Sequence, residues 1–262
     1  MKNKYLKNFF IGLVFLFLYL PIIILIIFSF NTSRMNIIFE DFTVDWYHTL
    51  FQNRDLLNAF LNTMIIAVTS TAISTVIGTM SAVGLHKYDF PFKNLVQKLI
   101  YIPIVIPEIV LGISLLSMYT LMKLELGMFT LILSHVAFSI PYVIVSVRST
   151  LSYELKTYEE AAYDLGANSF MTFFKVTLPS IMPGVVSGAT LAFTLSMDDV
   201  VISYFTAGPG SNTLPLKIYS MIKTGITPDV NAMSALMLLF TIVILTCSVI
   251  VQSRKIVVGD RR

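Results

Sequence analysis

Six long apolar stretches constrain this chain more strongly than any other feature of its sequence. Each is about 20 residues long, which is the length that an α-helix needs to cross the hydrocarbon core of a bilayer. Charged residues make up only 13% of the 262 residues, whereas a soluble globular domain carries roughly 25%. The sequence therefore predicts an all-α membrane protein with six transmembrane helices, at about residues 9–30, 59–85, 96–122, 128–147, 184–205 and 231–251.

The first stretch follows three lysines, and secretory signal peptides begin in the same way. The apolar part of a signal peptide, however, has only about 7–15 residues and ends at a cleavage site with small residues. Here the apolar run is longer, it leaves through the sequence FSFN at residues 28–31, and it has no Ala-x-Ala site. We therefore interpret it as a retained transmembrane helix.

Lysine and arginine are distributed unevenly between the connections. Most of the 18 lie in four alternate segments, at residues 2–7, 86–98, 148–175 and 252–262. In membrane proteins the cytoplasmic loops carry the excess of Lys and Arg, so we expect both termini to be cytoplasmic. We also expect three parts: an N-terminal transmembrane helix with its outer loop at residues 1–58, a transmembrane core at 59–252 with a cytoplasmic loop at 149–180, and a cytoplasmic tail at 253–262.

The loop at residues 149–180 is the longest hydrophilic interruption of the chain. Its first half has apolar residues at helical spacing and predicts a short helix, followed by Gly166 where a left-handed helix end is needed. Its second half predicts another short helix with an apolar face that includes Phe170 and Phe174, ended by Pro179 and Pro183. A slim, charged helix–glycine–helix element at a membrane face is suited to docking with a soluble partner.

Several residues of this loop form a spaced pattern. Glu160-Ala161-Ala162 is followed after three residues by Gly166, after nine more by Val176, and after one more by Leu178-Pro179. The pattern resembles the EAA loop of ABC-importer permeases, although that family usually has isoleucine at the position of Val176. The resemblance implies the MetI-like fold of type I ABC importers, in which this loop is the coupling helix seated in a cleft of the ATPase subunit. An ordinary amphipathic cytoplasmic loop is the alternative.

The sequence contains no recognisable site for a nucleotide. A phosphate-binding loop needs Gly-x4-Gly-Lys-Ser/Thr, and no glycine here is followed by lysine. We therefore expect this chain to bind no cofactor and to catalyse no reaction, with ATP and Mg bound by a partner ATPase. His48, His86 and His135 are scattered without metal-ligand spacing, so we interpret them as packed or solvated side chains.

Three carboxylates lie deep in the predicted spans. Glu108 follows Pro103 and Pro107, which can open the backbone and bend the third helix around a cavity, and Asp198 and Asp199 lie in the fifth. An ionisable side chain at membrane depth is costly unless it faces a cavity or a partner, and Lys and Arg are confined to the ends of these spans. The carboxylates therefore favour a cationic cargo; the alternatives are neutral hydrogen-bonded acids or pairing with a partner permease.

Neighbouring side chains on an α-helix point about 100° apart. We therefore expect Asp198 to face the pathway and Asp199 to orient it or to pair with a neighbouring subunit. Two aromatic residues near the predicted outer mouth, Trp46 and Tyr204, are expected to offer ring faces to an ammonium group. An interfacial belt of aromatic side chains is the alternative for both.

The residues around the aspartate pair extend the resemblance. The sequences LSMDDVVIS at 195–203, FTAGPG at 205–210, TLP at 213–215 and IYS at 218–220 are similar to those of permease subunits of spermidine/putrescine ABC importers. The resemblance covers nearly the whole chain and implies roles in a polyamine pathway for Trp46, Glu108, Ser196, Asp198 and Asp199. At position 108 it leads us to expect aspartate, so glutamate keeps the charge and changes its reach.

The same resemblance implies what surrounds the chain. It would lie in the bacterial cytoplasmic membrane beside a second permease subunit, with an ATPase dimer inside and an extracytoplasmic polyamine-binding protein outside; no nucleic acid is expected. One alternative is an ABC permease for another small cargo, such as iron, thiamine or phosphonate. The other is an ATP-independent carrier or a membrane-embedded enzyme. An anionic cargo would favour basic residues at membrane depth, where the sequence has none.

Overall fold

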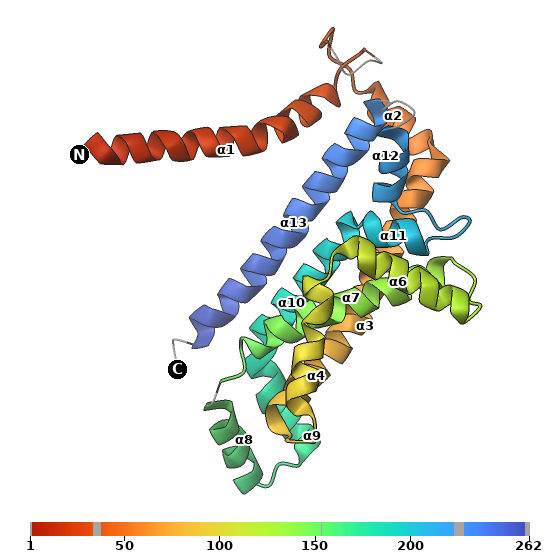
Figure 1. Cartoon of the computed structure of the whole chain (residues 1–262). Helices are drawn as coiled ribbons and strands as arrows, with labels where there is room; N and C mark the ends of the chain where they lie inside the picture. Colours follow the sequence, from red (N-terminus) through yellow and green to blue (C-terminus); the bar gives the residue numbers. More distant parts are fainter. Residues whose placement is uncertain (1, 34–37, 153, 223–227, 260–262) are drawn as a thin grey trace. The chain divides into compact units, whose positions relative to one another are not determined.

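The computed structural model describes residues 2–33, 38–152, 154–222 and 228–259, and the regular structure of these residues is helical (Figure 1). Five helices are long and apolar enough to cross a membrane, and a sixth crossing results if one bent pair counts as a single span. They are Leu6–Phe28, Arg54–Lys87, Met128–Arg148, Ser169–Asp198, Pro228–Cys247 and the pair Lys93–Val105 with Glu108–Leu121. The prediction of an all-α membrane protein is confirmed.

The chain divides into two compact units. The first joins Met1–Asn58 to Ile218–Val243, and the second joins Ala59–Lys217 to Ile244–Arg262. The boundaries between the units fall within the helices α3 (Arg54–Lys87), α12 (Leu214–Ile222) and α13 (Pro228–Gly259). Of the predicted tail, residues 260–262 lie outside the described residues.

The first unit contains α1 (Lys2–Phe28) and α2 (Asp45–Gln52). Polar contacts hold the connection between these helices. The indole of Trp46 donates to the backbone oxygen of Asn31, and the hydroxyls of Tyr47 and Ser29 share a hydrogen bond of 2.9 Å. These contacts hold residues 29–31, just after α1, against the first turn of α2.

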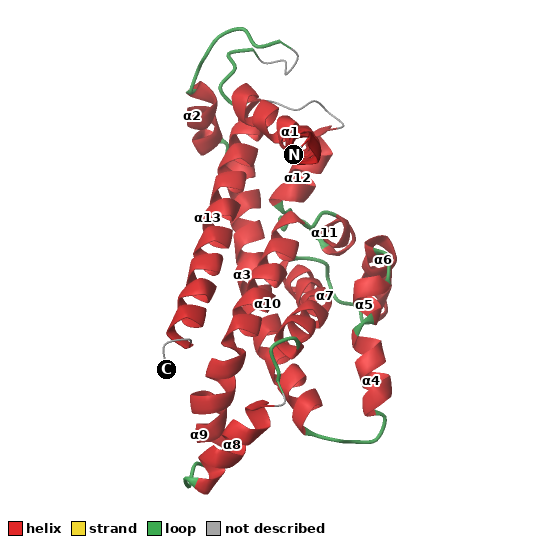
Figure 2. Ribbon diagram, turned by 90° about the vertical axis from the view of Figure 1, so that its left-hand side faces the viewer, coloured by secondary structure: helices red, strands yellow, loops and turns green. Residues whose placement is uncertain are grey.

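The core of the second unit is built on α7 (Met128–Arg148) and α10 (Leu178–Asp198), which pack side by side (Figure 2). A β-carbon added at Gly184 of α10 would lie 2.8 Å from the backbone oxygen of Ser146 in α7. Small residues allow membrane helices to approach this closely. The Ser146 hydroxyl donates to the carbonyl oxygen of Gly184 at 3.0 Å, so the close approach also satisfies a polar group.

The third predicted span is broken just before Glu108. Helices α4 (Lys93–Ile100) and α5 (Ile102–Val105) precede the break, α6 (Glu108–Leu121) follows it, and the two sides are bent by 108°. Ile106 and Pro107 are extended, with ψ of 135° and 134°, and proline has no N–H to continue a helix. The predicted opening of the backbone ahead of Glu108 is confirmed.

The loop at 149–180 contains the helix–glycine–helix element predicted for it. Helix α8 (Glu154–Asp164) is followed by Gly166, whose φ of +86° is left-handed and favours glycine. Asn168 then caps α9 (Ser169–Thr172) by accepting a hydrogen bond from the Met171 amide at 2.8 Å. We call residues 154–179 the EAA segment.

The prediction that Pro179 and Pro183 end the second short helix is wrong. Helix α9 continues through a π-helical turn, η1 (Phe173–Thr177), into α10, so one crossing covers Ser169–Asp198. Pro179 is tolerated because it lies in the first turn of α10, and Pro183 lies inside the helix. The fifth crossing therefore begins before residue 184, and it ends at Asp198 instead of residue 205.

Beyond Asp198 the backbone becomes extended at Asp199, and α11 (Val201–Thr206) is a separate short helix. Helix α11 packs against α6, where Ile202 joins an apolar cluster with Leu115, Tyr119 and Phe138. Both α6 and α11 begin at a backbone break. Because these two helices pack together at their starts, the breaks at residues 106–107 and 199–200 lie in the same part of the second unit (Figure 1).

Candidate functional site

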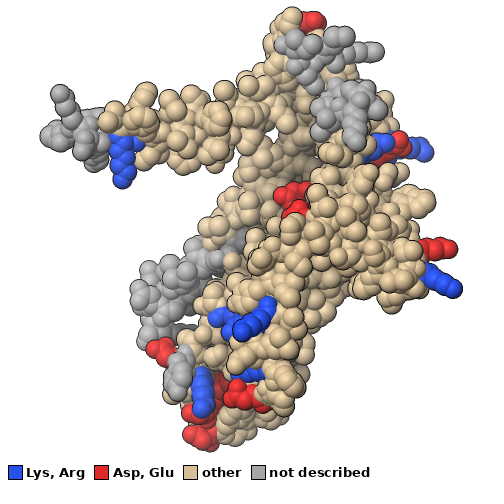
Figure 3. Space-filling view, viewed as in Figure 1, with Lys and Arg blue, Asp and Glu red and all other residues tan. Residues whose placement is uncertain are grey.

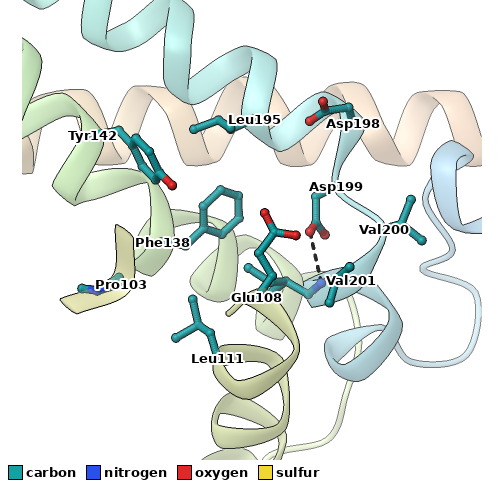
Figure 4. Close-up of a pocket in the computed structure, with 11 residues that line it drawn as sticks. Pro103, Glu108, Leu111, Phe138, Tyr142, Leu195, Asp198, Asp199, Val200 and Val201 are labelled. Atoms are coloured by element: carbon teal, nitrogen blue, oxygen red, sulfur yellow. Dashed lines mark hydrogen bonds between the residues drawn. The ribbon is translucent and has the colours of Figure 1, made fainter. Parts of the chain in front are cut away.

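A cavity of about 290 Å³ lies between these two backbone breaks (Figure 4). Its wall comes from the α5–α6 break, from α7, and from the end of α10 with the start of α11. The lining residues are Pro103, Glu108, Leu111, Phe138, Tyr142, Leu195, Asp198, Asp199, Val200, Val201 and Ile202. The cavity thus combines three carboxylates with two aromatic rings and an aliphatic wall.

Glu108 enters the cavity because the helix restarts there. It is the first residue of α6, and its side chain is exposed. Figure 4 shows it extending from α6 into the cavity, on the side of Phe138 and Asp199. Within the part of the chain that the structure describes, no basic side chain forms an ion pair with Glu108.

Asp198 is the last residue of α10, and its side chain is also exposed. A carboxylate at a helix C-terminus faces the negative end of the helix dipole, so α10 does not stabilise its charge. Among the described residues, Asp198 likewise forms no ion pair with a basic side chain. Two carboxylates from different helices therefore line this cavity without a cationic partner.

Asp199 differs from them because its side chain is only 5% exposed. One of its oxygens, Oδ1, accepts from the Ile202 amide at 3.1 Å. The other, Oδ2, accepts from the amide and the hydroxyl of Ser203, each at 2.7 Å, and lies 3.5 Å from Nε2 of His135. Asp199 is thus engaged by the first turn of α11 and by a histidine of α7.

The histidine belongs to a buried polar network that joins four helices. His135 is fully buried, with Nδ1 2.7 Å from the Ser196 hydroxyl and Nε2 3.2 Å from the Ser203 hydroxyl. Ser196 in turn lies 3.3 Å from the hydroxyl of Ser70 in α3. The interpretation of His135 as a packed side chain was correct, but the sequence did not indicate that it contacts Asp199.

The structure brings together three of the six predicted pathway residues, Glu108, Asp198 and Asp199. Both aspartates reach the cavity because α10 ends between them, so the spacing of 100° expected on a continuous helix does not apply. Ser196 lies behind the cavity wall in the His135 network. Tyr204 on α11 is 60% exposed and is not among the lining residues, and Trp46 belongs to the first unit.

The EAA segment lies at the end of the second unit that is remote from α11 (Figures 1 and 2). Of the residues in its spaced pattern, Ala162, Val176 and Leu178 are partly buried, whereas Glu160, Ala161, Gly166 and Pro179 are exposed. Large apolar side chains are also exposed along it: Tyr158, Tyr163, Leu165, Phe170 and Phe174. The segment therefore presents an uncovered, partly apolar surface.

One carboxylate anchors this segment to the rest of the unit. Glu159 is buried, and its Oε1 lies 2.7 Å from Nζ of Lys87 at the end of α3. The same oxygen accepts a hydrogen bond from the Thr177 hydroxyl in η1. Glu159 thus ties α8 both to α3 and to the turn that leads into α10.

A metal site does not emerge from the described residues. No group of three or more His, Cys, Asp and Glu side chains among them is arranged to hold a metal ion. The chemistry available in the cavity is therefore that of carboxylates and rings, which attract organic cations.

Comparison with known proteins gives three findings. Residues 74–254 match the family described as binding-protein-dependent transport system inner membrane component. The chain is 42% identical over 255 residues to the spermidine/putrescine transport system permease protein PotC of Escherichia coli K12, covering 97% of each chain. It is 37% identical over 231 residues to the putrescine transport system permease protein PotI of the same organism, covering 86% of this chain and 82% of the relative.

Solved structures agree with the fold at low sequence identity. A bacterial ABC transporter that imports the acidic polysaccharide alginate superposes with a TM-score of 0.71 and 15% identity, covering 94% of both chains. The MetNI methionine ABC transporter in an inward-facing conformation superposes with a TM-score of 0.62 and 18% identity, covering 76% of this chain and 95% of that chain. These two likenesses establish the MetI-like fold.

Proposed function

The chain belongs to the family of binding-protein-dependent transport system inner membrane components, and from this premise we propose that it is a permease subunit of an ATP-driven bacterial polyamine importer. It is a multi-pass membrane protein. Spermidine and putrescine are the cargo named for relatives that are 42% and 37% identical to it. The chain itself would contribute half of the pathway and no enzymatic activity.

The observation that carries this proposal is the cavity with two carboxylates that have no basic partner within the described ranges of the chain. A polyamine is a thin alkyl chain with ammonium groups along it, so it needs separated negative charges and apolar walls. Glu108 and Asp198 supply the charges from two different helices, and Leu111 and Leu195 supply aliphatic surface. The ring of Phe138 can also face an ammonium group, which contributes about 1–2 kcal/mol when both are desolvated.

The driving force would come from other subunits. An ATPase dimer, which would bind ATP and Mg, would dock on the EAA segment, at Glu160, Ala161, Ala162 and Gly166 on the α8 side and at Val176, Leu178 and Pro179 on the α10 side. The second half of the EAA segment, α9 with η1, runs into α10, and α10 reaches Asp198 without interruption. A rigid movement of α10 could therefore carry the motion of the ATPase subunits to the cavity. A second permease would complete the pathway, and an extracytoplasmic binding protein would deliver the polyamine.

Other cargoes are less well suited to this cavity. An anionic cargo such as a phosphonate would need basic side chains, and no Lys or Arg is among the described residues that line the cavity. An ATP-independent carrier would have no use for an exposed docking segment. Purification of the complex from membranes separates this last alternative, because a carrier of that kind would be isolated without an ATPase.

The proposal is tested by replacing Asp198 with asparagine in the complete transporter. We expect spermidine uptake into proteoliposomes to fall about tenfold, since one charge–charge contact of roughly 1.4 kcal/mol is lost from the pathway, while the subunits still assemble. The matched control is Asp89→Asn in the turn after α3, where the ammonium group of Lys93 lowers the pKa of an exposed carboxylate. Wild-type uptake by the Asp198 variant would contradict the proposed pathway.

A further inference from the structure

The buried network behind the cavity divides its three carboxylates into two kinds. Building on the proposed function, we propose that His135 is a positioning residue that fixes Asp199 in the cavity wall through its Nε2–H group. The ammonium groups of the cargo are then bound by Glu108 and Asp198, and not by Asp199. Three features of the structure carry this assignment.

The first feature is the occupancy of the Asp199 oxygens. A carboxylate offers about four lone-pair positions. Asp199 uses one for the Ile202 amide, two for the amide and hydroxyl of Ser203, and faces His135 with the same oxygen that Ser203 contacts. Both positions of Oδ2 are thus occupied and Oδ1 keeps a single one, on a side chain that is only 5% exposed, so Asp199 offers an ammonium group far less access than the exposed Glu108 and Asp198 do.

The second feature is the direction of the hydrogen bonds. The Ser203 hydroxyl has one hydrogen, which it donates to Oδ2 of Asp199 at 2.7 Å. Its oxygen can therefore only accept from Nε2 of His135, which lies 3.2 Å away. Nε2 must carry a proton whether the imidazole is neutral or charged, so His135 presents a donor to both Ser203 and Asp199.

The third feature is the support on the other side of the ring. Nδ1 of His135 lies 2.7 Å from the Ser196 hydroxyl, and Ser196 lies 3.3 Å from Ser70 in α3. The ring also lies 5.2 Å from that of Phe138, which lines the cavity. Ser196 and His135 thus act as one buried support, in which Ser196 holds the imidazole and the imidazole holds Asp199.

This arrangement leaves two carboxylates for the cargo. Glu108 at the start of α6 and Asp198 at the end of α10 are both exposed, whereas Asp199 between α10 and α11 is engaged. Two separated carboxylates suit a cargo with at least two ammonium groups. Asp199 then sets the course of the chain from α10 into α11, and with it the part of the cavity wall formed by Val200 and Val201.

Two substitutions of the histidine test the assignment, both in the complete transporter. In His135→Gln the side-chain amide reaches the position of Nε2 and can still donate, whereas in His135→Asn the amide reaches only the position of Nδ1. We expect uptake within about twofold of wild type for the first variant and about tenfold lower for the second, which corresponds to a coupling within the usual range for contacting residues. Equal impairment of the two variants would overturn the proposal.

A double-variant cycle separates positioning from cargo binding. If His135 acts through Asp199, the combination of His135→Asn with Asp199→Asn should lower uptake no further than Asp199→Asn alone. Its combination with Asp198→Asn should multiply the two losses, because that carboxylate acts on the cargo. Multiplied losses with Asp199→Asn would mean that Asp199 binds cargo independently of His135, which overturns the inference.

The proposed function and this inference fail in distinguishable ways. Wild-type uptake by Asp198→Asn would contradict the proposed pathway itself. The histidine variants test only which carboxylates bind the cargo and which one is held in the cavity wall. If His135→Asn does not assemble, Ser203→Ala replaces it, since it removes a single hydroxyl from the same network. We expect it to lower uptake and the melting temperature of the cargo-free complex; wild-type values for both would overturn the positioning role.

Discussion

Two buried carboxylates of the second unit are held by different partners, Glu159 in the EAA segment and Asp199 in the cavity wall. Glu159 faces a full positive charge, since Nζ of Lys87 lies 2.7 Å from it. Asp199 is held by two amides, a hydroxyl and the imidazole of His135. The anchor of the EAA segment is therefore neutralised by a lysine, whereas the cavity retains two further carboxylates that form no ion pair with any basic side chain the structure describes.

The two regions also differ in how closely their backbones pack. Charged side chains gather over the end of the second unit that carries α8 (Figure 3), and Leu165 and Phe170 are 90% and 73% exposed there. On the side of the unit that carries the cavity, by contrast, the backbone at Gly208, just after α11, lies against the turn at Leu126 and Gly127. Leu126 packs on the apolar cluster that contains Phe138 and Ile202, which line the cavity. The contrast suggests that changes near the cavity cost the chain its own stability, and that changes in the EAA segment are tolerated better.

The largest effect is expected at Gly208. A β-carbon built there would lie 1.8 Å from the backbone oxygen of Leu126, so one of the two backbone segments must move. Overpacking of this kind costs about 3 kcal/mol or more when backbone has to shift. We expect Gly208→Ala to lower the melting temperature of the purified complex strongly, or to prevent its isolation.

Gly127 on the other side of this contact provides the control. A β-carbon there has nothing within 4 Å, and its φ of 171° is extended backbone that any residue adopts. Gly127→Ala should therefore leave the melting temperature nearly unchanged. Equal melting temperatures for the Gly208 and Gly127 variants would show that the close contact contributes nothing to stability.

An intermediate effect is expected at the Lys87–Glu159 pair. The side chains are 23% and 10% exposed, so solvent screens the pair, and we expect about 2 kcal/mol instead of the roughly 3–5 kcal/mol lost when a fully buried pair loses one partner. Lys87→Met and Glu159→Gln should each lower the melting temperature and weaken retention of the ATPase. The double variant should lose less than the sum, because neither charge is left alone.

An exposed ion pair within α8, Lys156 with Glu160, serves as the comparison for the Lys87–Glu159 double-variant cycle. Nζ of Lys156 lies 3.8 Å from Glu160, and the two side chains are 70% and 63% exposed. Such pairs contribute roughly 0.3–0.5 kcal/mol, so Lys156→Met should be close to wild type in stability. Strictly additive losses in the Lys87–Glu159 cycle would mean that the two side chains do not stabilise each other.

The EAA segment was predictable because its signals are local in the sequence. Helical spacing gave α8, and the left-handed conformation of Gly166 is confirmed. The prediction that Pro179 and Pro183 end the second short helix failed because the π-helical turn η1 joins α9 to α10 just before Pro179. The sequence carries no signal for such a turn. The anchor at Glu159 was also missed, since its partner Lys87 is distant in the sequence and the pairing depends on tertiary packing.

The cavity was predictable only in part. Pro107 indicated the break before Glu108, and the depth of the three carboxylates singled them out. His135 was missed because it lies on the fourth predicted span, where an apolar helical pattern indicates that a side chain is packed but not which residue it contacts. That Asp199 begins a new helix, and so differs from Asp198, follows from a break in α10 that no proline or glycine marks.

Apart from the control variants, the smallest effect is expected at Gly166, whose substitution can be compared directly with that of Gly208. No atom lies within 4 Å of a β-carbon built there, so the cost of Gly166→Ala comes only from the φ of +86°. That strain is about 1 kcal/mol, and Gly166→Asn should cost less, because asparagine adopts left-handed backbone more readily than alanine. Thermal melting of the purified complex should therefore rank the variants Gly208→Ala, Gly166→Ala and Gly166→Asn from least to most stable. If Gly166→Ala were as damaging as Gly208→Ala, the EAA segment would have to be packed against the rest of the unit as tightly as the turn after α11, and the contrast between the two regions would be wrong.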